Sequence, residues 1–346
     1  MSVYHLTEEH VLFQQSIKKW VDQQLTPKSK EMETNRAVDE SLISSLQSLG
    51  FLTATLPESL GGLNADVTWN VLLLEEIAKA GATGFAQIIK QHAAMSLPLL
   101  TIYLKQQLLV SQCLEQNDYC TYAKKRSNQH KLLVVNGQNA RYLIVHDIDH
   151  HQLSLYDTNT LQVTPVDDLV GWHTANIAHI DLQGNALHSV QLAAQESFHI
   201  QATNDLLDAA IFYGIAQIAY EQTKNYTQTR IQFDGPLTQF QVVRHQLVDM
   251  KIEVDKLRHF LYVAAFNNNQ PHFITQSFAL RLFVEREVPT ITDWAVQFHG
   301  GNGFMMEYDP QRFWRDSQMY VVLNREYSYS ASEIGKIIHL SHATIH

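Results

Sequence analysis

Two segments in the last third of the chain contain residue types that suit ligand binding. RIQFDGPLTQFQVVRHQLVDM (residues 230–250) begins with Arg230, and DWAVQFHGGNGFMMEYDPQRFWRD (residues 293–316) contains Gly300 and Gly301. A guanidinium presents paired donors in a plane, which suits a phosphate, and glycines leave the backbone open to close approach. Taken singly, the arginine is more often a surface ion-pair member. The glycines follow helical sequence, so they do not form a Rossmann phosphate loop.

A string of residues that can ligate metals lies near the middle of the chain: His146, Asp147, Asp149, His150 and His151. These residues fall at the end of a predicted strand and in the following turn. Neighbouring side chains there point to opposite faces, so few of them could share one ion. The 18 histidines show no HExxH or comparable spacing. We therefore expect a solvated turn and no metal site, and we find neither a nucleophile elbow nor a P-loop.

The elements that must position the two segments follow a helical, then β, then helical order. Helical periodicity predicts an N-terminal helical domain over residues 1–115, whose first helix is capped by Thr7. Short β-type runs between turn signals predict a shortened middle β domain of about five or six strands over residues 116–200. Apolar residues in three-four alternation predict a C-terminal helical bundle over residues 201–346, with Pro236 in the first turn of one of its helices.

Composition restricts the class of protein. The chain has 346 residues, 45% of them hydrophobic, so it can bury a substantial core. The formal net charge of −10 disfavours nucleic acid and anionic membranes as partners, and no apolar run is long enough for membrane insertion. The two cysteines, Cys113 and Cys120, fit a reducing compartment. Since no signal-peptide pattern is visible, we expect a cytoplasmic protein.

In their order and separation, the two C-terminal segments resemble the signature pair of the acyl-CoA dehydrogenase family. These flavoproteins desaturate acyl thioesters next to the carbonyl. LGFLTATLPESLGG (residues 49–62) is similar to the family's N-terminal pattern, and the helical, β, helical order is also the family's. The resemblance implies an α+β multidomain fold with an N-terminal helical domain, a small middle β-barrel-like domain and a C-terminal four-helix bundle.

The resemblance also implies FAD as the cofactor. In the family, the arginine and phenylalanine of an RxxF motif reach the flavin of a neighbouring subunit. A following glutamine hydrogen-bonds the cofactor, and a QxxGG segment lets the backbone approach the adenine half. The matching residues here are Arg230, Phe233, Gln241, Gln297, Gly300 and Gly301.

The chain departs from the family where the catalytic base would lie. Desaturation needs a carboxylate to remove the α-proton while the flavin accepts a hydride from the β-carbon. Asn324 occupies the usual position of this base, and Asn204 occupies the position used by one branch of the family. The loop that follows is longer than usual, which allows Glu326 to act as the base. Alternatively, Glu326 is a solvated loop charge beside Arg325.

The shortened middle domain departs from the family as well. Val135 stands where a flavin-contacting threonine would be. Asp234 replaces a family glycine close to the expected phosphates, and Asp205 stands where some relatives have a substrate-facing arginine. By simple Coulomb repulsion, both aspartates are expected to disfavour an anionic ligand.

Three functions remain open. The first is FAD-dependent α,β-desaturation of an acyl thioester, carried by CoA or by a carrier protein, with an electron-transfer partner. The second is a non-catalytic subunit that completes the flavin site of a homologous partner by donating Arg230. The third is a flavin-dependent monooxygenase or oxidase, which needs no α-proton base. We place the CH–CH oxidoreductase first because it is the family's prevailing activity, and we expect a homodimer, a homotetramer or a heterotetramer with a homologous subunit.

Overall fold

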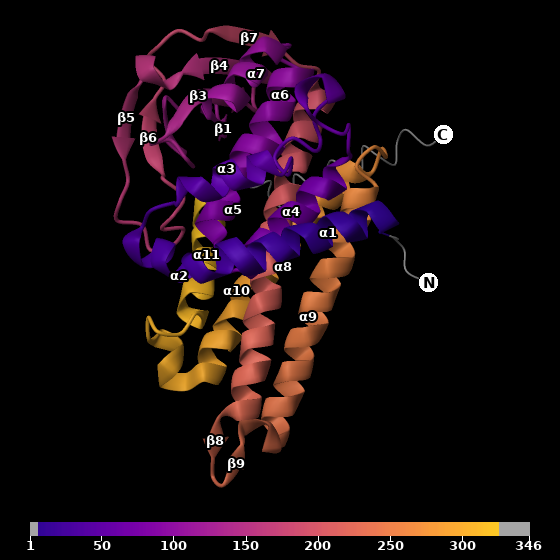
Figure 1. Ribbon diagram of the computed structural model, residues 1–346, viewed down its shortest axis with the longest axis vertical. Coiled ribbons are helices and arrows are strands. Elements are labelled where there is room, and N and C mark those ends of the chain that lie inside the picture. The colour runs from indigo at the N-terminus through magenta and orange to yellow at the C-terminus, as the bar shows by residue number, and fades with distance from the viewer. Residues whose placement is uncertain (1–5, 325–346) are drawn as a thin grey trace.

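The structure is a computed structural model and describes residues 6–324. Helices pack around one side of a small β region, and two long helices extend away from it to a hairpin (Figure 1). The N-terminal helices are α1 (Glu8–Trp20), α2 (Thr26–Asn35), α3 (Glu40–Ser48), α4 (Val67–Lys79), α5 (Thr83–Ile89), α6 (Leu97–Ile102) and α7 (Gln107–Gln116), with π-helical turns η1 (Val21–Leu25) and η3 (Lys90–Ser96) and 3-10 turn η2 (Glu58–Leu60).

Thr7 caps α1 as predicted, because its side chain accepts a hydrogen bond from the backbone N–H of His10. Pro98 does not interrupt the helical stretch after Thr83. It lies in the first turn of α6, where proline is tolerated, and the chain leaves the helix only after Ile102.

The β region consists of two sheets with a small apolar core between them. One sheet has the order β1-β3-β4-β7 and the other β2-β6-β5. Strands β1 and β3 pair in parallel, and the other pairs within these two sheets are antiparallel. The strands are β1 (Tyr119–Lys125), β2 (Lys131–Val134), β3 (Ala140–Asp147), β4 (Gln152–Asp157), β5 (Gln162–Pro165), β6 (Ala178–Asp181) and β7 (His188–Gln191), with 3-10 turn η4 (Thr158–Thr160).

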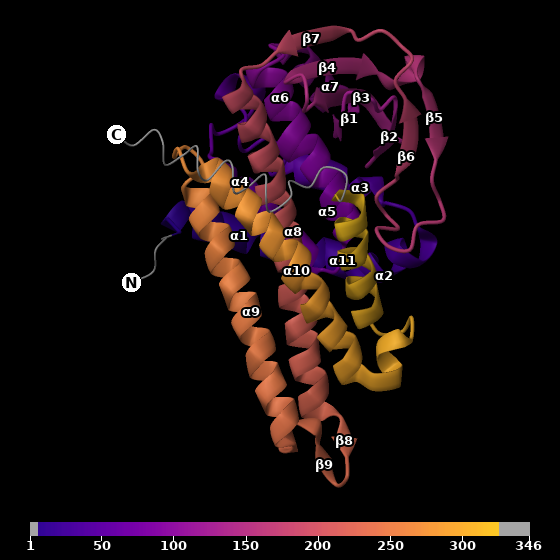
Figure 2. The same cartoon turned by 180° about the vertical axis from the view of Figure 1, so that it is seen from behind.

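The C-terminal region is built on α8 (Ala194–Thr229), whose 36 residues run without a break. Gly214 allows α8 to pack closely on α4, because a Cβ atom there would lie 2.6 Å from the backbone oxygen of Glu75. A view from behind shows α9 and α10 beside α8 (Figure 2). The remaining elements are the hairpin β8 (Ile231–Gln232) and β9 (Gly235–Pro236), α9 (Gln241–Phe266), α10 (Phe273–His299) and α11 (Pro310–Asn324), with 3-10 turns η5 (Leu237–Gln239) and η6 (Gly300–Phe304).

The apolar stripe predicted for α9 is buried at Met250, Val254, Leu257 and Leu261. The prediction for Pro236 was wrong, because this residue lies in strand β9 and α9 begins only at Gln241. The β8–β9 hairpin and the 3-10 turn η5 lie between Arg230 and Phe240, so α9 begins only after them.

The predicted fold class is confirmed: helices, small sheets and a C-terminal set of helices follow one another. The domain boundaries at residues 115/116 and 200/201 remain predictions. Within residues 6–324, no helix is both long and apolar enough to cross a membrane.

His92 connects the N-terminal helices to the β region. It lies in η3, and its Nδ1 accepts a hydrogen bond from the backbone N–H of Cys120 in β1 at 3.1 Å. The side chain is buried, and this burial lowers the pKa of His92 to about 4. The imidazole is therefore neutral in the folded protein at neutral pH.

We predict that the unfolding free energy of His92→Asn falls less than that of the wild type when the pH is lowered below 6.5. The folded-state pKa of His92 is lowered, so its contribution is complete above pH 6.5 and is lost as the pH falls towards about 4. The shift corresponds to about 3 kcal/mol. Asparagine retains an acceptor for Cys120 but does not titrate. Urea denaturation at pH 7 and pH 4.5 should show a smaller drop in unfolding free energy for the variant, and equal drops would contradict the assignment.

Candidate functional site

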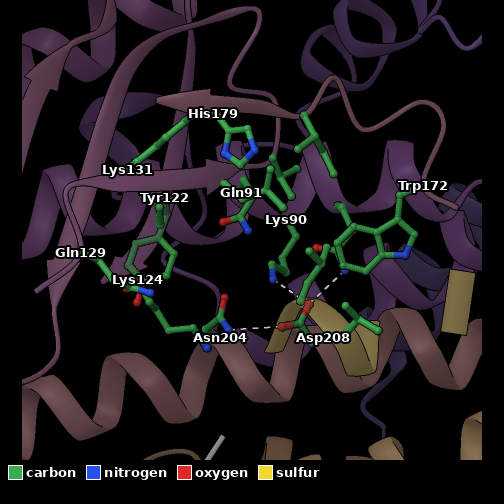
Figure 3. Close-up of a pocket in the computed structure, with 17 residues that line it drawn as sticks. Lys90, Gln91, Tyr122, Lys124, Gln129, Lys131, Trp172, His179, Asn204 and Asp208 are labelled. Atoms are coloured by element: carbon green, nitrogen blue, oxygen red, sulfur yellow. Dashed lines mark hydrogen bonds and ion pairs between the residues drawn. The ribbon is translucent and has the colours of Figure 1, made fainter. Parts of the chain in front are cut away.

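A cavity of about 390 Å³ lies where the β region meets the helices. Figure 3 shows side chains from β1, β2, β6, α8 and the α5–η3 segment converging on it. The lining includes two positions to which the family resemblance assigned different roles: one is a flavin contact and the other is a position of the catalytic base. Val135, expected beside a flavin, follows β2, and Asn204, expected at a base position, lies on α8. Both residues therefore line the same cavity.

A buried ion pair forms part of the cavity wall. Lys90 Nζ lies 2.6 Å from Asp208 Oδ1, and both side chains are at most 4% exposed. Gln87 donates to the same oxygen at 3.0 Å, and Asn204 donates to Asp208 Oδ2 at 3.2 Å. Three hydrogen bonds thus fix the position of this carboxylate and tie α8 to the start of η3.

Lys124 brings a second cation to the cavity. It extends from β1, lies 3.7 Å from Asp205 Oδ1 and is 9% exposed. Burial lowers the pKa of Lys124, and the nearby Asp205 opposes this shift.

The expectation that Asp205 repels an anionic ligand is wrong. The side chain is buried and lies close to both Lys124 and the guanidinium of Arg281, 3.4 Å from Arg281 Nη1. Its charge is compensated within the protein. Asp234 is exposed in the β8–β9 turn, so its predicted repulsion of phosphates remains a prediction.

Trp172 lines one side of the cavity and is held in place by Asp316 of α11. Its backbone N–H donates to Asp316 Oδ1 at 2.8 Å, and its indole N–H donates to the Asp316 carbonyl at 2.9 Å. Burial and the nearby Glu33 raise the pKa of Asp316 to about 6. The two hydrogen bonds to Asp316 position the tryptophan. Asp316 itself does not line the cavity.

Two cavity-lining polar atoms make no hydrogen bond within residues 6–324. They are Oε1 of Gln91, whose side chain is only 7% exposed, and Nδ1 of His179. An unpaired buried polar atom costs about 1–3 kcal/mol, so we expect these two atoms to have a partner beyond the described residues. The cavity is prepared for a molecule, or for water, that forms hydrogen bonds.

The six residues predicted to bind FAD lie elsewhere, at the far end of α8. Arg230 caps its C-terminus, Gln241 begins α9, and Phe233 lies between them in the β8–β9 turn. On α8, Tyr226 stacks on His299 with ring centroids 4.1 Å apart. This contact brings the diglycine corner after α10 to the same end of the bundle.

These residues are open to the surface. Arg230 and Gln297 are exposed, and their side chains make no hydrogen bond or ion pair in the part of the chain that the structure describes. Phe233 is 85% exposed and has a φ of 51°, a strained conformation for an aromatic residue. Gln241 Nε2 lies 3.4 Å from His245 Nε2.

Gly301 gives a further indication that a ligand or a partner chain approaches this end. Its φ is not positive, and a Cβ atom there would meet nothing within 4 Å. Nothing within the described chain explains why this residue lacks a side chain. By contrast, the fold itself explains the other two glycines. Gly300 has a φ of 56°, and a Cβ atom on Gly303 would lie 2.3 Å from a backbone oxygen. The free guanidinium, the free amide and the bare backbone fit a dinucleotide phosphate and its adenine half.

The cavity and the far-end residues cannot form one site within a single protomer. Asp208 and Arg230 are separated by 22 residues of continuous helix, or about 33 Å at about 1.5 Å per residue. Their convergence through a second copy of the chain remains a prediction.

The candidate base is not positioned by the structure. Glu326 lies outside the described residues, and Asn324 is the last described residue of α11. Within residues 6–324, Asp208 is the one lining residue with a carboxylate, and it is bound to Lys90.

The histidine and aspartate string at residues 146–151 has local roles. His146 is buried between Tyr122 and Ser197, and Asp147 pairs with Lys125. Within residues 6–324, no group of three His, Cys, Asp or Glu side chains is arranged to hold a metal ion.

Sequence reasoning missed the charged lining of the cavity. Lys90 stands in the apolar stretch GFAQIIKQHAAM (residues 84–95), and Asp208 stands in LLDAAIFYG (residues 206–214). A lone charge in each of two apolar helical stretches is a signal of a buried pair, because unpaired burial is costly. Which two charges meet could not be read from the sequence.

Comparisons with known proteins show the family. Residues 7–107 match the model of the acyl-CoA dehydrogenase N-terminal domain, and residues 206–324 match that of the C-terminal domain. A probable acyl-CoA dehydrogenase, YngJ of Bacillus subtilis strain 168, is 26% identical over 97% of this chain and 98% of its own.

Two solved structures share the fold. Butyryl-CoA dehydrogenase of Megasphaera elsdenii has a TM-score of 0.81 at 20% identity, over 99% of this chain and all of the other. A glutaryl-CoA dehydrogenase of Mycobacterium smegmatis in complex with FADH2 has a TM-score of 0.80 at 17% identity, over 96% of this chain and 95% of the other. The chain belongs to the acyl-CoA dehydrogenase family.

Proposed function

We propose that the protein is an FAD-dependent dehydrogenase that desaturates an acyl thioester between its α- and β-carbons. The observation that carries the proposal is that Val135 and Asn204 lie on the wall of one cavity. These positions match a flavin contact and a base position of the family. The substrate's reacting carbons would lie between the strand side and α8. When bound, FAD supplies the hydride acceptor for this reaction.

The chain's own residues would act at two places, the cavity and the C-terminal end of α8. The apolar side chains of Leu133, Val135 and Trp172 shield the reacting carbons from water at the cavity. Arg230, Phe233 and Gln241 from one end, with Gln297, Gly300 and Gly301 beside them, would hold the dinucleotide of a neighbouring copy. The 33 Å span, about 22 residues of helix, supports this division because Arg230 cannot reach its own cavity.

The α-proton requires a base, and we assign this role to Glu326. Asn324 and Asn204 cannot accept a proton, and the carboxylate of Asp208 is engaged in an ion pair with Lys90. Glu326 follows α11, whose last turn contributes Val322 and Leu323 to the cavity lining. Glu326 is only three residues from Leu323 in the sequence, and this short separation supports the assignment.

A second function is favoured by the same lining. Because no unpaired carboxylate lines the cavity within residues 6–324, the chain also suits the role of a non-catalytic subunit. Such a subunit would present Arg230 to the flavin of a homologous, active partner. Purification from the native host would then yield a heteromer whose other subunit carries a glutamate at the usual base position.

The visible spectrum tests FAD binding. The purified chain, incubated with FAD and desalted, should be yellow with one flavin per chain. Arg230→Met should weaken FAD binding by about tenfold or more, since a charge-assisted hydrogen bond is lost. Arg286→Met, which removes an exposed arginine from the middle of α10, is the matched control. A colourless wild-type protein would reject the dehydrogenase for the homomer and leave the partner role.

Anaerobic bleaching of the flavin by an acyl-CoA tests the base. It should be lost in Glu326→Gln, because an amide cannot remove the α-proton, and it should persist in Asn324→Ala. Bleaching by Glu326→Gln at the wild-type rate would exclude Glu326 and would require another base.

Substitutions at Gly301 and Gly303 test whether a ligand approaches the turn that follows α10. Gly301→Ala should leave the thermal midpoint of the FAD-free protein within a few degrees of wild type, since the new methyl group meets open space. Gly303→Ala should lower it, because the methyl group would meet the Val296 carbonyl. Only Gly301→Ala should weaken FAD binding without destabilising the chain. Unchanged FAD affinity in Gly301→Ala would show that the cofactor does not contact this backbone.

A further inference from the structure

A second hollow lies next to the cavity. Its volume is about 240 Å³, and Val166, Leu169, Trp172 and Ile177 form the apolar part of its lining, which polar side chains complete. Trp172 and Ile177 also line the cavity of the proposed site. These two residues therefore belong to a wall that the cavity and the second hollow share.

The shared wall lies at the inner end of the cavity. Figure 3 shows the indole of Trp172 at one end of the space, whereas Gln129 and Lys131 lie at the opposite end. Lys131 is exposed, and Trp172 is buried. A molecule that enters the cavity past Lys131 would therefore meet the indole at the far end.

Trp172 has a backbone conformation that is unfavourable for a residue of its size. Its φ is 55°, in the left-handed region that bulky residues rarely adopt. Glycine would adopt the same conformation without strain. The chain therefore keeps an indole at this position against the preference of the backbone, which indicates that the indole has a role.

The segment that carries Trp172 is fixed on two sides. Asp316 of α11 holds the tryptophan through two hydrogen bonds. A Cβ atom on Gly171 would lie 2.8 Å from Asp316 Oδ1, and a Cβ atom on Gly84 of α5 would lie 2.6 Å from Thr174 Oγ1. The two glycines thus allow α11 and α5 to approach the segment closely. These contacts hold the indole in one place, as a fixed wall requires.

We propose that Trp172 is a specificity-determining residue, which limits the length of the acyl group that the cavity admits. The inference rests on the proposed function, because it takes the acyl chain to lie in this cavity. The end of the chain would meet the indole. Beyond the indole, Val166 and Leu169 offer an apolar lining that a longer chain could reach if the indole were removed.

The test measures how affinity depends on acyl length. The probes are straight-chain thioesters of 4′-phosphopantetheine, from butanoyl to dodecanoyl in steps of two carbons. Isothermal titration calorimetry of the full chain, with and without FAD, should show affinity rising about fourfold for each methylene that is buried. The rise should stop at the length at which the chain meets the indole. A rise that continues through dodecanoyl, or no binding of any probe, would overturn the proposal.

Substitutions in the shared wall locate the limit. Trp172→Gly removes the indole and relieves the backbone strain. It should bind the first probe beyond the wild-type limit about tenfold or more tightly than the wild type does, because two further methylenes become buried. Ile177→Ala opens the same wall and should also move the limit to longer chains. Circular dichroism melts identify a variant that fails to fold, and the other variant then decides.

Leu169→Ala is the matched control. Leu169 lines the second hollow but not the cavity, so its truncation enlarges only the space behind the indole. This variant should keep the wild-type limit. A limit that moves in Leu169→Ala, or a wild-type limit in folded Trp172→Gly, would overturn the assignment.

The same measurements distinguish a failure of this inference from a failure of the proposed function. A limit that moves in Trp172→Gly, in a protein that takes up no FAD, would support the role of the indole and reject the redox function. Flavin bleaching at equal rates by every probe, in the wild type and in Trp172→Gly, would support the dehydrogenase and reject the length limit. Loss of FAD binding in Trp172→Gly with an unchanged limit would assign the indole to the cofactor and reject the inference.

Discussion

The rigid length of α8 constrains every functional position in this protein. At 36 residues it is the longest helix within residues 6–324, and it contacts both the N-terminal helices and the other C-terminal helices. Its N-terminal half presents Asn204 and Asp208 to the cavity, whereas its C-terminus presents Arg230 to solvent. Because one straight helix cannot bring its two ends together, the two groups of residues can serve one cofactor only if a second chain supplies one of them.

Buried charge is the second constraint. Lys90, Lys124, Asp205, Asp208 and Arg281 lie together where α8 meets the β region, and each is stable there only because it is paired. A purely structural link between helices would be made as well by apolar side chains. Three of these charged residues, Lys90, Lys124 and Asp208, line a cavity in which Gln91 Oε1 has no partner within residues 6–324.

Local patterns predicted the order of elements, the Thr7 cap and the α9 stripe, because each depends on residues close in sequence. The far-end residues were predicted from the spacing of the two motifs, and their role in binding FAD stays a prediction. Contacts that join distant residues could not be predicted: Lys90 meets Asp208 across 118 positions, and Asp205 meets Arg281 across 76. The start of α9 was misplaced because Pro236 suits a strand end as well as a first helical turn.

The shared-site account is tested most directly by mixing two defective chains. One carries Arg230→Met, and the other carries Val135→Trp, which fills the cavity. Each alone should bind FAD poorly. After mixing through a dissociated state, random dimers should recover about a quarter of the wild-type FAD sites, since half are mixed and each mixed dimer has one intact site. Recovery near this value would support a site built from two chains, and no recovery among confirmed mixed dimers would contradict it.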